Sequence, residues 1–196
     1  MKSTHNKIRA AGKGLLTTII MVTGTAALMA ACSTVKAPPK AYNQDQLPAA
    51  VMVPPGNVVA LETTAVGVLN YECRANVPTA GTIGWVLASP KAELLGRDGV
   101  AVVDYSGPPA TWKHRDGSSV VGTQLAVSPT VGATNLPLQL SKAAPGTGMG
   151  VLQNVTYIQR VKTKGGMEFT KACTQTDIGD KLTLPYQADY IFWKAA

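Results

Sequence analysis

The segment TWKHRDGSS, residues 111–119, gathers the side chains of this chain that are best suited to chemistry. Alternate residues of a strand share one face, so Trp112, His114 and Asp116 would line one side. A histidine beside a carboxylate can act as a general base, and a tryptophan ring can stack on a sugar or another flat ligand. The same pattern also fits an exposed hairpin whose Asp116 only forms the turn, and both interpretations stay open.

A hydrolase would also need a nucleophile, and Ser118 and Ser119 follow the histidine closely. The chain has no Gly-x-Ser-x-Gly elbow, the strand-to-helix turn that exposes such a serine. Its 11 acidic residues are scattered, so no carboxylate pair stands out for glycoside hydrolysis. An enzymatic function would therefore rest on His114 and the nearby acid.

A second candidate is the segment YIQRVKT, residues 157–163, in which Arg160 and Lys162 alternate with uncharged residues. On a regular strand these two cations would share a face and could bind an acidic glycan or a phosphate. Charges in this position also occur on solvated sheet faces, where they discourage edge-to-edge pairing. Arg160 is kept as a candidate binding residue.

The first residues of the chain have the layout of a secretory signal. Residues 1–14 are polar and basic, and residues 15–31 carry no charge and end in small side chains. This run is shorter than the roughly 20 apolar residues of a spanning helix. An uncleaved membrane anchor is the alternative. We therefore assign 1–31 to a signal peptide and leave it out of the fold.

The signal ends in MAAC, residues 29–32, which resembles the bacterial lipobox, where small residues precede a cysteine that is acylated and becomes the mature N-terminus. Met29 stands where leucine is usual, and Leu28 lies one residue earlier. Cys32 is thus the predicted lipid anchor, and its acyl chains would make the membrane a partner. Ser33 favours the outer membrane by resemblance to enterobacterial sorting. Ordinary cleavage, which would give a soluble secreted or periplasmic protein, is the alternative.

Cys73 and Cys173 remain as an even pair once Cys32 is assigned. An exported chain meets an oxidising compartment, so we predict a disulfide between them. A metal pair or a reactive thiol is the alternative. The chain has no Cys-x-x-Cys, and His114 is its one histidine after the signal, whereas a structural zinc site takes four such ligands. We expect no metal and no cofactor.

The net charge of +7 would suggest a nucleic-acid partner, but its distribution along the chain does not support one. Residues 1–31 hold four basic residues and no acid, and the remainder holds 14 basic against 11 acidic residues. These later charges are scattered and form no stripe, so we expect no nucleic-acid partner.

Residues 32–57 read as a proline-rich tether, because five of the 13 prolines fall there and no hydrophobic periodicity is present. Residues 58–196 show recurring strand signals broken by Gly, Pro and Asp-Gly. Asp116-Gly117 suits a two-residue type I′ turn between two strands. Only residues 89–96 suit a short helix, with Pro90 at its first position. We predict one all-β domain, an antiparallel sandwich or small barrel of about 7–9 strands with at most one short helix.

Four blocks of the sequence resemble a family of small secreted bacterial and fungal proteins that is defined as a domain of unknown function. The blocks are NYEC (70–73), GPPATWKHRDGSSVVG (107–122), GMGVLQNVTYIQRVKTKGG (148–166) and PYQADYIFW (185–193). The resemblance covers roughly 58–196 and implies a secreted, cysteine-paired β domain without an established activity.

The chain departs from the family pattern at two places. Asp104-Tyr105 stands where the family has His-Tyr, and residues 136–140 replace a Trp-Leu-Leu run. A function of that histidine would be lost here, and Tyr105 remains as a candidate binding residue. Some fungal members carry a malate dehydrogenase label, but the nearest glycine motif, GTGMGV at 146–151, has Val151 in place of the third glycine and precedes a strand. We interpret it as a turn.

These observations favour an exported envelope lipoprotein that binds or scaffolds a partner at the cell surface and is not an enzyme. An enzyme acting on envelope polysaccharide or peptide through His114 is the competing hypothesis. A third is a small barrel for an apolar ligand, lined by the aromatic residues near the C-terminus, Tyr186, Tyr190, Phe192 and Trp193.

Overall fold

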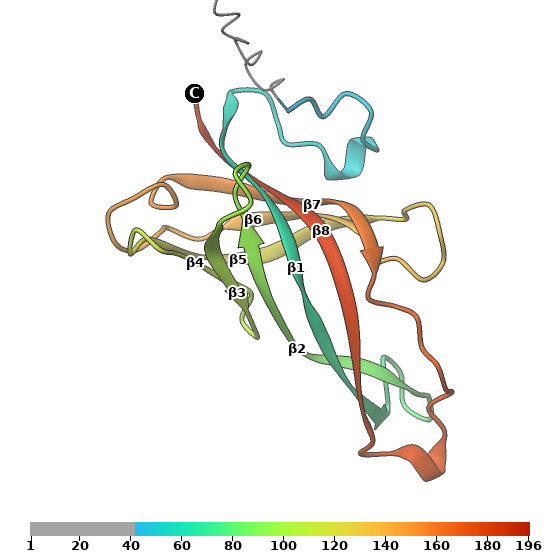
Figure 1. The fold of residues 1–196 in the computed structure, drawn as a ribbon. Helices are drawn as coiled ribbons and strands as arrows, with labels where there is room; N and C mark the ends of the chain where they lie inside the picture. Colours follow the sequence, from blue (N-terminus) through green and yellow to red (C-terminus); the bar gives the residue numbers. More distant parts are fainter. Residues whose placement is uncertain (1–41) are drawn as a thin grey trace, which may run out of the picture. The chain divides into compact units, whose positions relative to one another are not determined.

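The computed structural model describes residues 42–196 (Figure 1). Cys32 and the predicted signal segment 1–31 lie outside the described residues. Within 42–196, no helix is long and apolar enough to cross a membrane. The described part contains eight strands, β1 (Asn57–Ala75), β2 (Ile83–Leu95), β3 (Ala101–Ser106), β4 (Thr111–His114), β5 (Ser119–Ser128), β6 (Leu138–Ala143), β7 (Val155–Gly165) and β8 (Lys181–Ala195), and two 3₁₀ turns, η1 (Ala49–Val51) and η2 (Gln175–Asp177).

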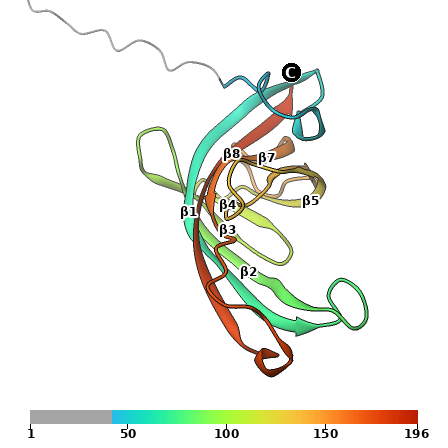
Figure 2. The same cartoon turned by 90° about the vertical axis from the view of Figure 1, so that its right-hand side faces the viewer.

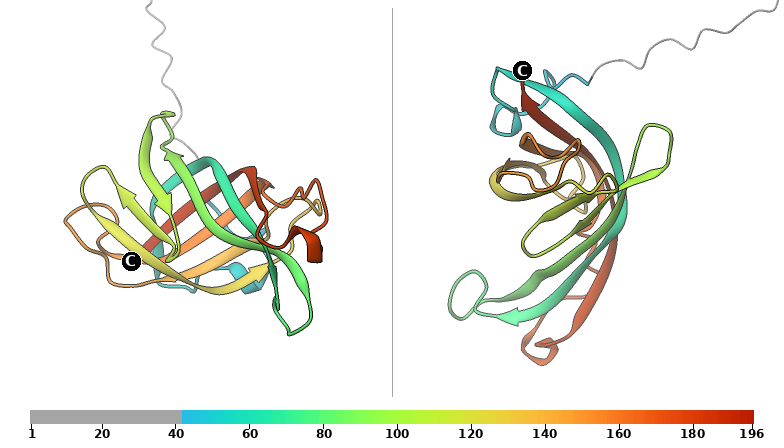
Figure 3. Two further views of the ribbon diagram at one scale, coloured as in Figure 1. Left: turned by 90° about the horizontal axis from the view of Figure 1, so that it is seen from below. Right: turned by 90° about the vertical axis from the view of Figure 1, so that its left-hand side faces the viewer.

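The eight strands form one antiparallel sheet that closes into a barrel. Each strand pairs with the next along the chain, and β8 returns to pair with β1. Figure 2 shows β1 and β8 as long, curved neighbours, and Figure 3 shows the closed ring of strands from below. The prediction of an all-β, antiparallel fold with seven to nine strands is confirmed, and of its two architectures the chain adopts the barrel.

The possible short helix at residues 89–96 is wrong, because this stretch belongs to β2 and continues into the following loop. Pro90, Ala92 and Leu94 are buried while the residues between them are more exposed, which is the period of a strand. Pairing of β2 with β3 begins only at Lys91. Pro90 therefore lies where β2 has a single neighbour, and its missing N–H breaks no hydrogen bond to β3.

The main core fills the interior of the barrel with side chains that alternate along the strands. On β8 the inward residues are Leu184, Tyr186, Ala188, Tyr190 and Phe192, all buried. They meet inward residues of the other strands, among them Leu69, Leu94, Val103, Trp112, Val120 and Ile158. The interior is thus filled by aliphatic side chains together with an unusual number of tyrosines.

A second core lies on the outside of β6, β7 and β8, under residues 42–53, which we call the N-terminal strap. Val51 and Val53 of the strap are buried against a patch of outward side chains that includes Leu140, Ile191 and Trp193. The packed structure therefore begins before the predicted boundary at Val58, and residues 42–57 are not a free tether. The strap has no periodic pattern because it is neither helix nor strand apart from η1.

Candidate functional site

His114 and Asp116 lie together at the end of the β4–β5 hairpin. Nδ1 of His114 lies 3.0 Å from the backbone nitrogen of Asp116 and also 3.0 Å from its Oδ2. The neutral imidazole accepts the backbone N–H, and the protonated imidazole pairs with the carboxylate. The two residues are thus adjacent, as the alternation of the sequence predicts.

The hairpin itself is present, but its turn differs from the prediction. A type I′ turn needs positive φ at both central residues, whereas only Gly117, at φ +94°, has it in this turn. The Gly117 N–H donates to the carbonyl of His114, and the His114 N–H donates to that of Ser118. The loop therefore has three residues, Arg115–Gly117, with glycine in the left-handed position.

The Asp116 carboxylate is occupied by the loops around it. Oδ1 accepts hydrogen bonds from Ser118 Oγ at 2.6 Å and from Ser118 N at 2.8 Å, and Oδ2 accepts one from Val151 N at 2.8 Å. These bonds, with that from the Ser118 hydroxyl the strongest, hold the pKa of Asp116 well below its usual range. The carboxylate thus joins the hairpin turn to residues 146–152.

Ser118 has no exposed surface, and its Oγ also accepts a hydrogen bond from Leu152 N at 3.1 Å. Its hydroxyl hydrogen points to Asp116 and not to His114, which is the reverse of a nucleophile activated by an imidazole base. The arrangement supports a structural role for this cluster.

The glycines of the segment 146–151 allow this close approach. A Cβ at Gly148 would lie 2.4 Å from the carbonyl oxygen of Gly117, and a Cβ at Gly150 would lie 2.2 Å from Asp116 Oδ2. Gly148 also has φ +72°. The segment consists of bends and turns and leads into β7 and not into a helix, so its interpretation as a turn is confirmed.

Trp112 lies on the same face of β4 as His114, as predicted, and is buried in the barrel interior. Its ring stacks on Tyr105 with centroids 4.8 Å apart, and it meets Tyr190 edge-on at 5.8 Å. Tyr105 contacts Tyr190 in turn at 5.5 Å. Trp112 and Tyr105, two of the candidate binding residues, are therefore direct neighbours in the interior.

Arg160 joins them from β7, where it pairs with Tyr190 of β8 and Gln139 of β6. Cross-strand partners share a face, so the guanidinium points to the barrel interior. Its Nε and Nη2 both donate to the carbonyl of Pro137, at 3.3 and 3.1 Å. Among residues 42–196, no carboxylate lies within ion-pair distance of Arg160.

Lys162 does not share this face, contrary to the prediction. A bulge between Val161 and Lys164 shifts the register of β7 against β8, and Lys162 adopts φ +49°. Its side chain is 73% exposed and pairs with Asp189 Oδ2 at 2.9 Å. Arg160 is thus separated from the cation that the sequence places beside it.

The interior around these aromatics holds polar atoms that lack partners. In the described part of the chain, Trp112 Nε1 and the hydroxyls of Tyr186 and Tyr190 are buried without a hydrogen bond. Burial raises the pKa of Tyr186 to about 12, and raises those of Tyr105 and Tyr190 further. The nearby Arg160 charge opposes this rise at all three tyrosines. They therefore stay protonated donors at neutral pH.

A pocket of about 300 Å³ is lined by Tyr105 and Arg160 of this group, and we call it the Arg160 pocket. It extends from β2 to β7, strands that are not neighbours in the closed order, so it crosses the barrel. Its polar lining comes from Tyr105, Gln124, Gln139 and Arg160. Its apolar lining includes Leu87, Pro90, Pro108, Leu136 and Pro137. A concave, mostly apolar lining with a few convergent polar groups is typical of small-molecule sites.

Two other hollows are weaker candidates. One of about 630 Å³ lies over β1, β2 and β3, lined by the mixed charges of Lys91, Glu93 and Asp104. The other, of about 90 Å³, lies beside the Lys162–Asp189 ion pair. In the described residues, no group of three or more His, Cys, Asp or Glu side chains could hold a metal ion.

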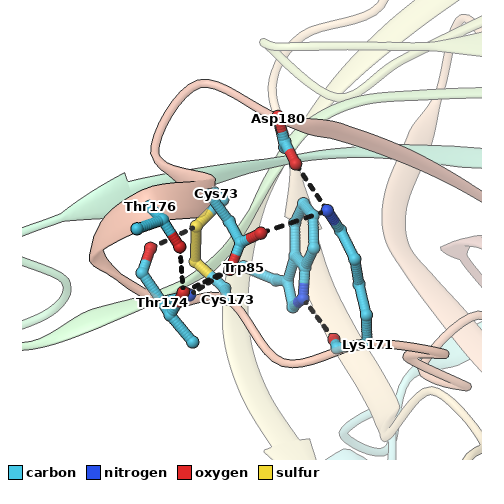
Figure 4. The surroundings of a disulfide bond; sticks show 8 residues. Cys73, Trp85, Lys171, Cys173, Thr174, Thr176 and Asp180 are labelled. Atoms are coloured by element: carbon cyan, nitrogen blue, oxygen red, sulfur yellow. Dashed lines mark hydrogen bonds and ion pairs between the residues drawn. A yellow bond between two sulfur atoms is a disulfide. The ribbon is translucent and has the colours of Figure 1, made fainter.

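The disulfide between Cys73 and Cys173 is present, as predicted (Figure 4), and neither cysteine lines the Arg160 pocket. It ties the loop after β7 to the end of β1. Lys171 in this loop pairs with Asp180 and Asp177, and its carbonyl accepts the Trp85 indole N–H at 3.0 Å. These contacts hold the loop against β2 and assign the cysteines a structural role.

The pocket also contains residues that sequence reasoning did not single out. Gln124 and Gln139 look like ordinary surface amides, and only the barrel register places them beside Arg160. Tyr186 and Tyr190, which the sequence did single out as possible lining of an apolar cavity, lie in the barrel core and not in the lining of this pocket.

Neither the curated proteins nor the solved structures contain a match to this chain. The sequence model of one family, described as "Protein of unknown function (DUF3455)", matches residues 54–194. That range takes in all eight strands apart from the last residue of β8, together with the pocket and the disulfide. The chain therefore belongs to the DUF3455 family.

Proposed function

We propose that this protein is an exported, lipid-anchored binding protein of the cell envelope, and that its barrel takes a small ligand into the Arg160 pocket. The observation that carries the binding function is the set of unpartnered donors inside the barrel. Trp112 Nε1 and the hydroxyls of Tyr186 and Tyr190 are buried without hydrogen bonds, beside an arginine without a carboxylate.

Such groups cost stability unless something satisfies them. A buried donor without an acceptor loses its bonds to water, at about 1–3 kcal/mol for each group. Three such atoms in one interior lower the stability of the protein relative to a core in which phenylalanine fills the same space. A ligand with acceptor atoms offsets this cost when it binds, and the adjoining pocket provides the space for it.

The hairpin cluster gives less support to an enzyme. Asp116 and Ser118 are committed to hydrogen bonds that hold the loop after β6, and Ser118 is fully buried. His114 also lies outside the lining of the Arg160 pocket. A binding function uses residues that the barrel brings together in the pocket. An enzyme would have to use Asp116 and Ser118, whose polar atoms are already hydrogen-bonded within the loops.

Native mass spectrometry of the protein purified from its own host tests the binding function. We expect a fraction of the protein to carry a small molecule that is released on unfolding. The matched comparison is the variant Arg160→Gln, purified in the same way, which should carry much less. A barrel that is empty in every preparation, and whose melting temperature no small molecule raises, would contradict the proposal.

The anchor is tested separately by the intact mass of the protein extracted from native membranes. The proposal predicts the mass of residues 32–196 plus acyl chains, and a gain of two hydrogens when the disulfide is reduced. The variant Cys32→Ala should lose the acyl mass and leave the membrane fraction. A soluble wild-type protein without acyl chains would make this a secreted or periplasmic binding protein.

A further inference from the structure

We infer that the ligand of the Arg160 pocket is a small organic acid, whose carboxylate binds the Arg160 guanidinium and whose planar, weakly polar body lies against Tyr105 and the prolines. This inference rests on the binding function proposed above and names the class of ligand. Charge, size and donor placement each support it independently.

The charge of the pocket selects a monoanion. Arg160 is the one ionised side chain in its lining, and the other polar groups are the neutral amides of Gln124 and Gln139 and the phenol of Tyr105. Guanidinium groups bind carboxylates and phosphates through parallel N–H donors. A single half-buried charge is matched by a carboxylate, whereas a phosphate dianion would keep one charge without a partner in a mostly apolar lining.

The lining of the pocket limits the rest of the ligand. Its volume of about 300 Å³ is at the lower end of the range for ligand sites, which suits a small molecule better than an acyl chain or a peptide. Pro90, Pro108, Pro137 and the Tyr105 ring give it flat, apolar walls. A planar body can stack on an aromatic ring and lie against such walls.

The barrel interior next to the pocket holds further hydrogen-bond donors. Trp112, Tyr186 and Tyr190 carry polar hydrogens that no acceptor takes up within the described part of the chain. Tyr190 is the cross-strand partner of Arg160, and Tyr186 lies on the same inward face of β8. The face of the barrel that carries Arg160 thus also carries donors without acceptors, and these favour a group that only accepts hydrogen bonds, which is the property of a carboxylate.

Isothermal titration of the full-length protein with benzoate and with benzamide separates charge from shape. The two molecules share a ring and a planar head group but differ in charge. We expect benzoate to bind at least tenfold more tightly than benzamide, and inorganic phosphate to bind more weakly than benzoate. The variant Arg160→Gln should lose this preference, and Arg160→Lys should restore part of it.

Lys164→Gln is the matched control, because it removes one exposed cation from the same strand without touching the pocket. It should leave benzoate binding unchanged. The variant Tyr186→Phe gives a second readout, since it removes a buried hydroxyl that has no hydrogen-bond partner. We expect it to weaken benzoate binding while raising the melting temperature of the empty protein by about 2–4 °C.

The outcomes separate this inference from the function on which it rests. Equal binding of benzoate and benzamide, tighter binding of phosphate, or unchanged benzoate binding in Arg160→Gln would overturn the organic-acid inference and leave a binding barrel in place. Failure of every small molecule to bind, together with an empty barrel from the native host, would overturn both. A co-purified neutral molecule would likewise overturn the organic-acid inference alone.

Discussion

Ser118 Oγ lies 2.6 Å from Asp116 Oδ1 and 3.1 Å from the backbone nitrogen of Leu152, and so connects the β4–β5 turn to the loop before β7. We expect Ser118→Ala to lower the free energy of unfolding by about 1–3 kcal/mol, because the buried Leu152 N–H loses its acceptor. Urea denaturation measures the change. Ser119→Ala, which removes an exposed contact with Thr147, should cost no more than about 0.5 kcal/mol. Equal losses in the two variants would contradict the role given to Ser118.

The disulfide closes a loop of 100 residues, which predicts a large contribution to stability. In the chain-entropy account, a crosslink of this span stabilises the folded state by about 4.7 kcal/mol. The double variant Cys73→Ser, Cys173→Ser should lose most of this amount in urea denaturation. Reducing the wild type should give the same loss, and a reductant should leave the double variant unchanged. A loss below about 1 kcal/mol would show that the contacts of Lys171 hold the loop without the disulfide.

Burial of Tyr186 predicts a loss of stability at high pH. Its pKa is about 12 in the folded protein against an ordinary value of 10.0, so the folded state holds the proton more tightly than the unfolded state. The contribution is complete below pH 10 and disappears between pH 10 and pH 12. Two pKa units correspond to about 3 kcal/mol.

Unfolding curves in urea at intervals across this pH range measure the effect, with phenolate absorbance as a direct readout. Tyr105 and Tyr190 shift in the same direction, so the wild type should lose stability steeply. Tyr186→Phe should lose less over the same range. Titration of all six tyrosines near pH 10 in the folded protein would show that the interior is open to water.

The hydrogen bonds of Gln159 hold the N-terminal strap against the barrel. It has no exposed surface; Nε2 donates to Gln44 Oε1 and to the carbonyl of Val51, and Oε1 accepts the indole N–H of Trp193. We expect Gln159→Leu to cost about 2–4 kcal/mol and to raise amide hydrogen exchange in residues 42–53 more than in the barrel. Gln187→Leu, on an exposed position of β8, is the control. Unchanged exchange in the strap would mean that Val51 and Val53 hold it by apolar contact alone.

Much of the fold follows from local patterns that the sequence displays. The alternation along residues 181–195, Asp116-Gly117 between two β-rich runs, and the even pair Cys73 and Cys173 predict strands, a hairpin and a disulfide that the structure contains. Each signal works because the interaction it reports is short in range or is a specific covalent bond.

The features that sequence reasoning missed depend on register between distant segments. The bulge at Lys162 turns that side chain outward, and no local signal reveals it, because it depends on how β7 meets β8. The strap shows no periodicity, so its burial depends on a surface formed by three other strands. Of the candidate binding residues, Tyr105 on β3 and Arg160 on β7 line one pocket only because the barrel brings their strands together, and Trp112 stacks on Tyr105 from the neighbouring strand.

The pairing of β1 with β8 also determines when, during synthesis of the chain, the barrel can close. Fifteen residues of β1 find their partners in the last strand, so Thr64 bonds to Asp189, 125 positions away. While the chain is still growing, β1 can pair on one side only, and its other edge stays open until the C-terminus has emerged. The barrel can therefore close only after β8 has been synthesised, which makes its closure a late step of folding.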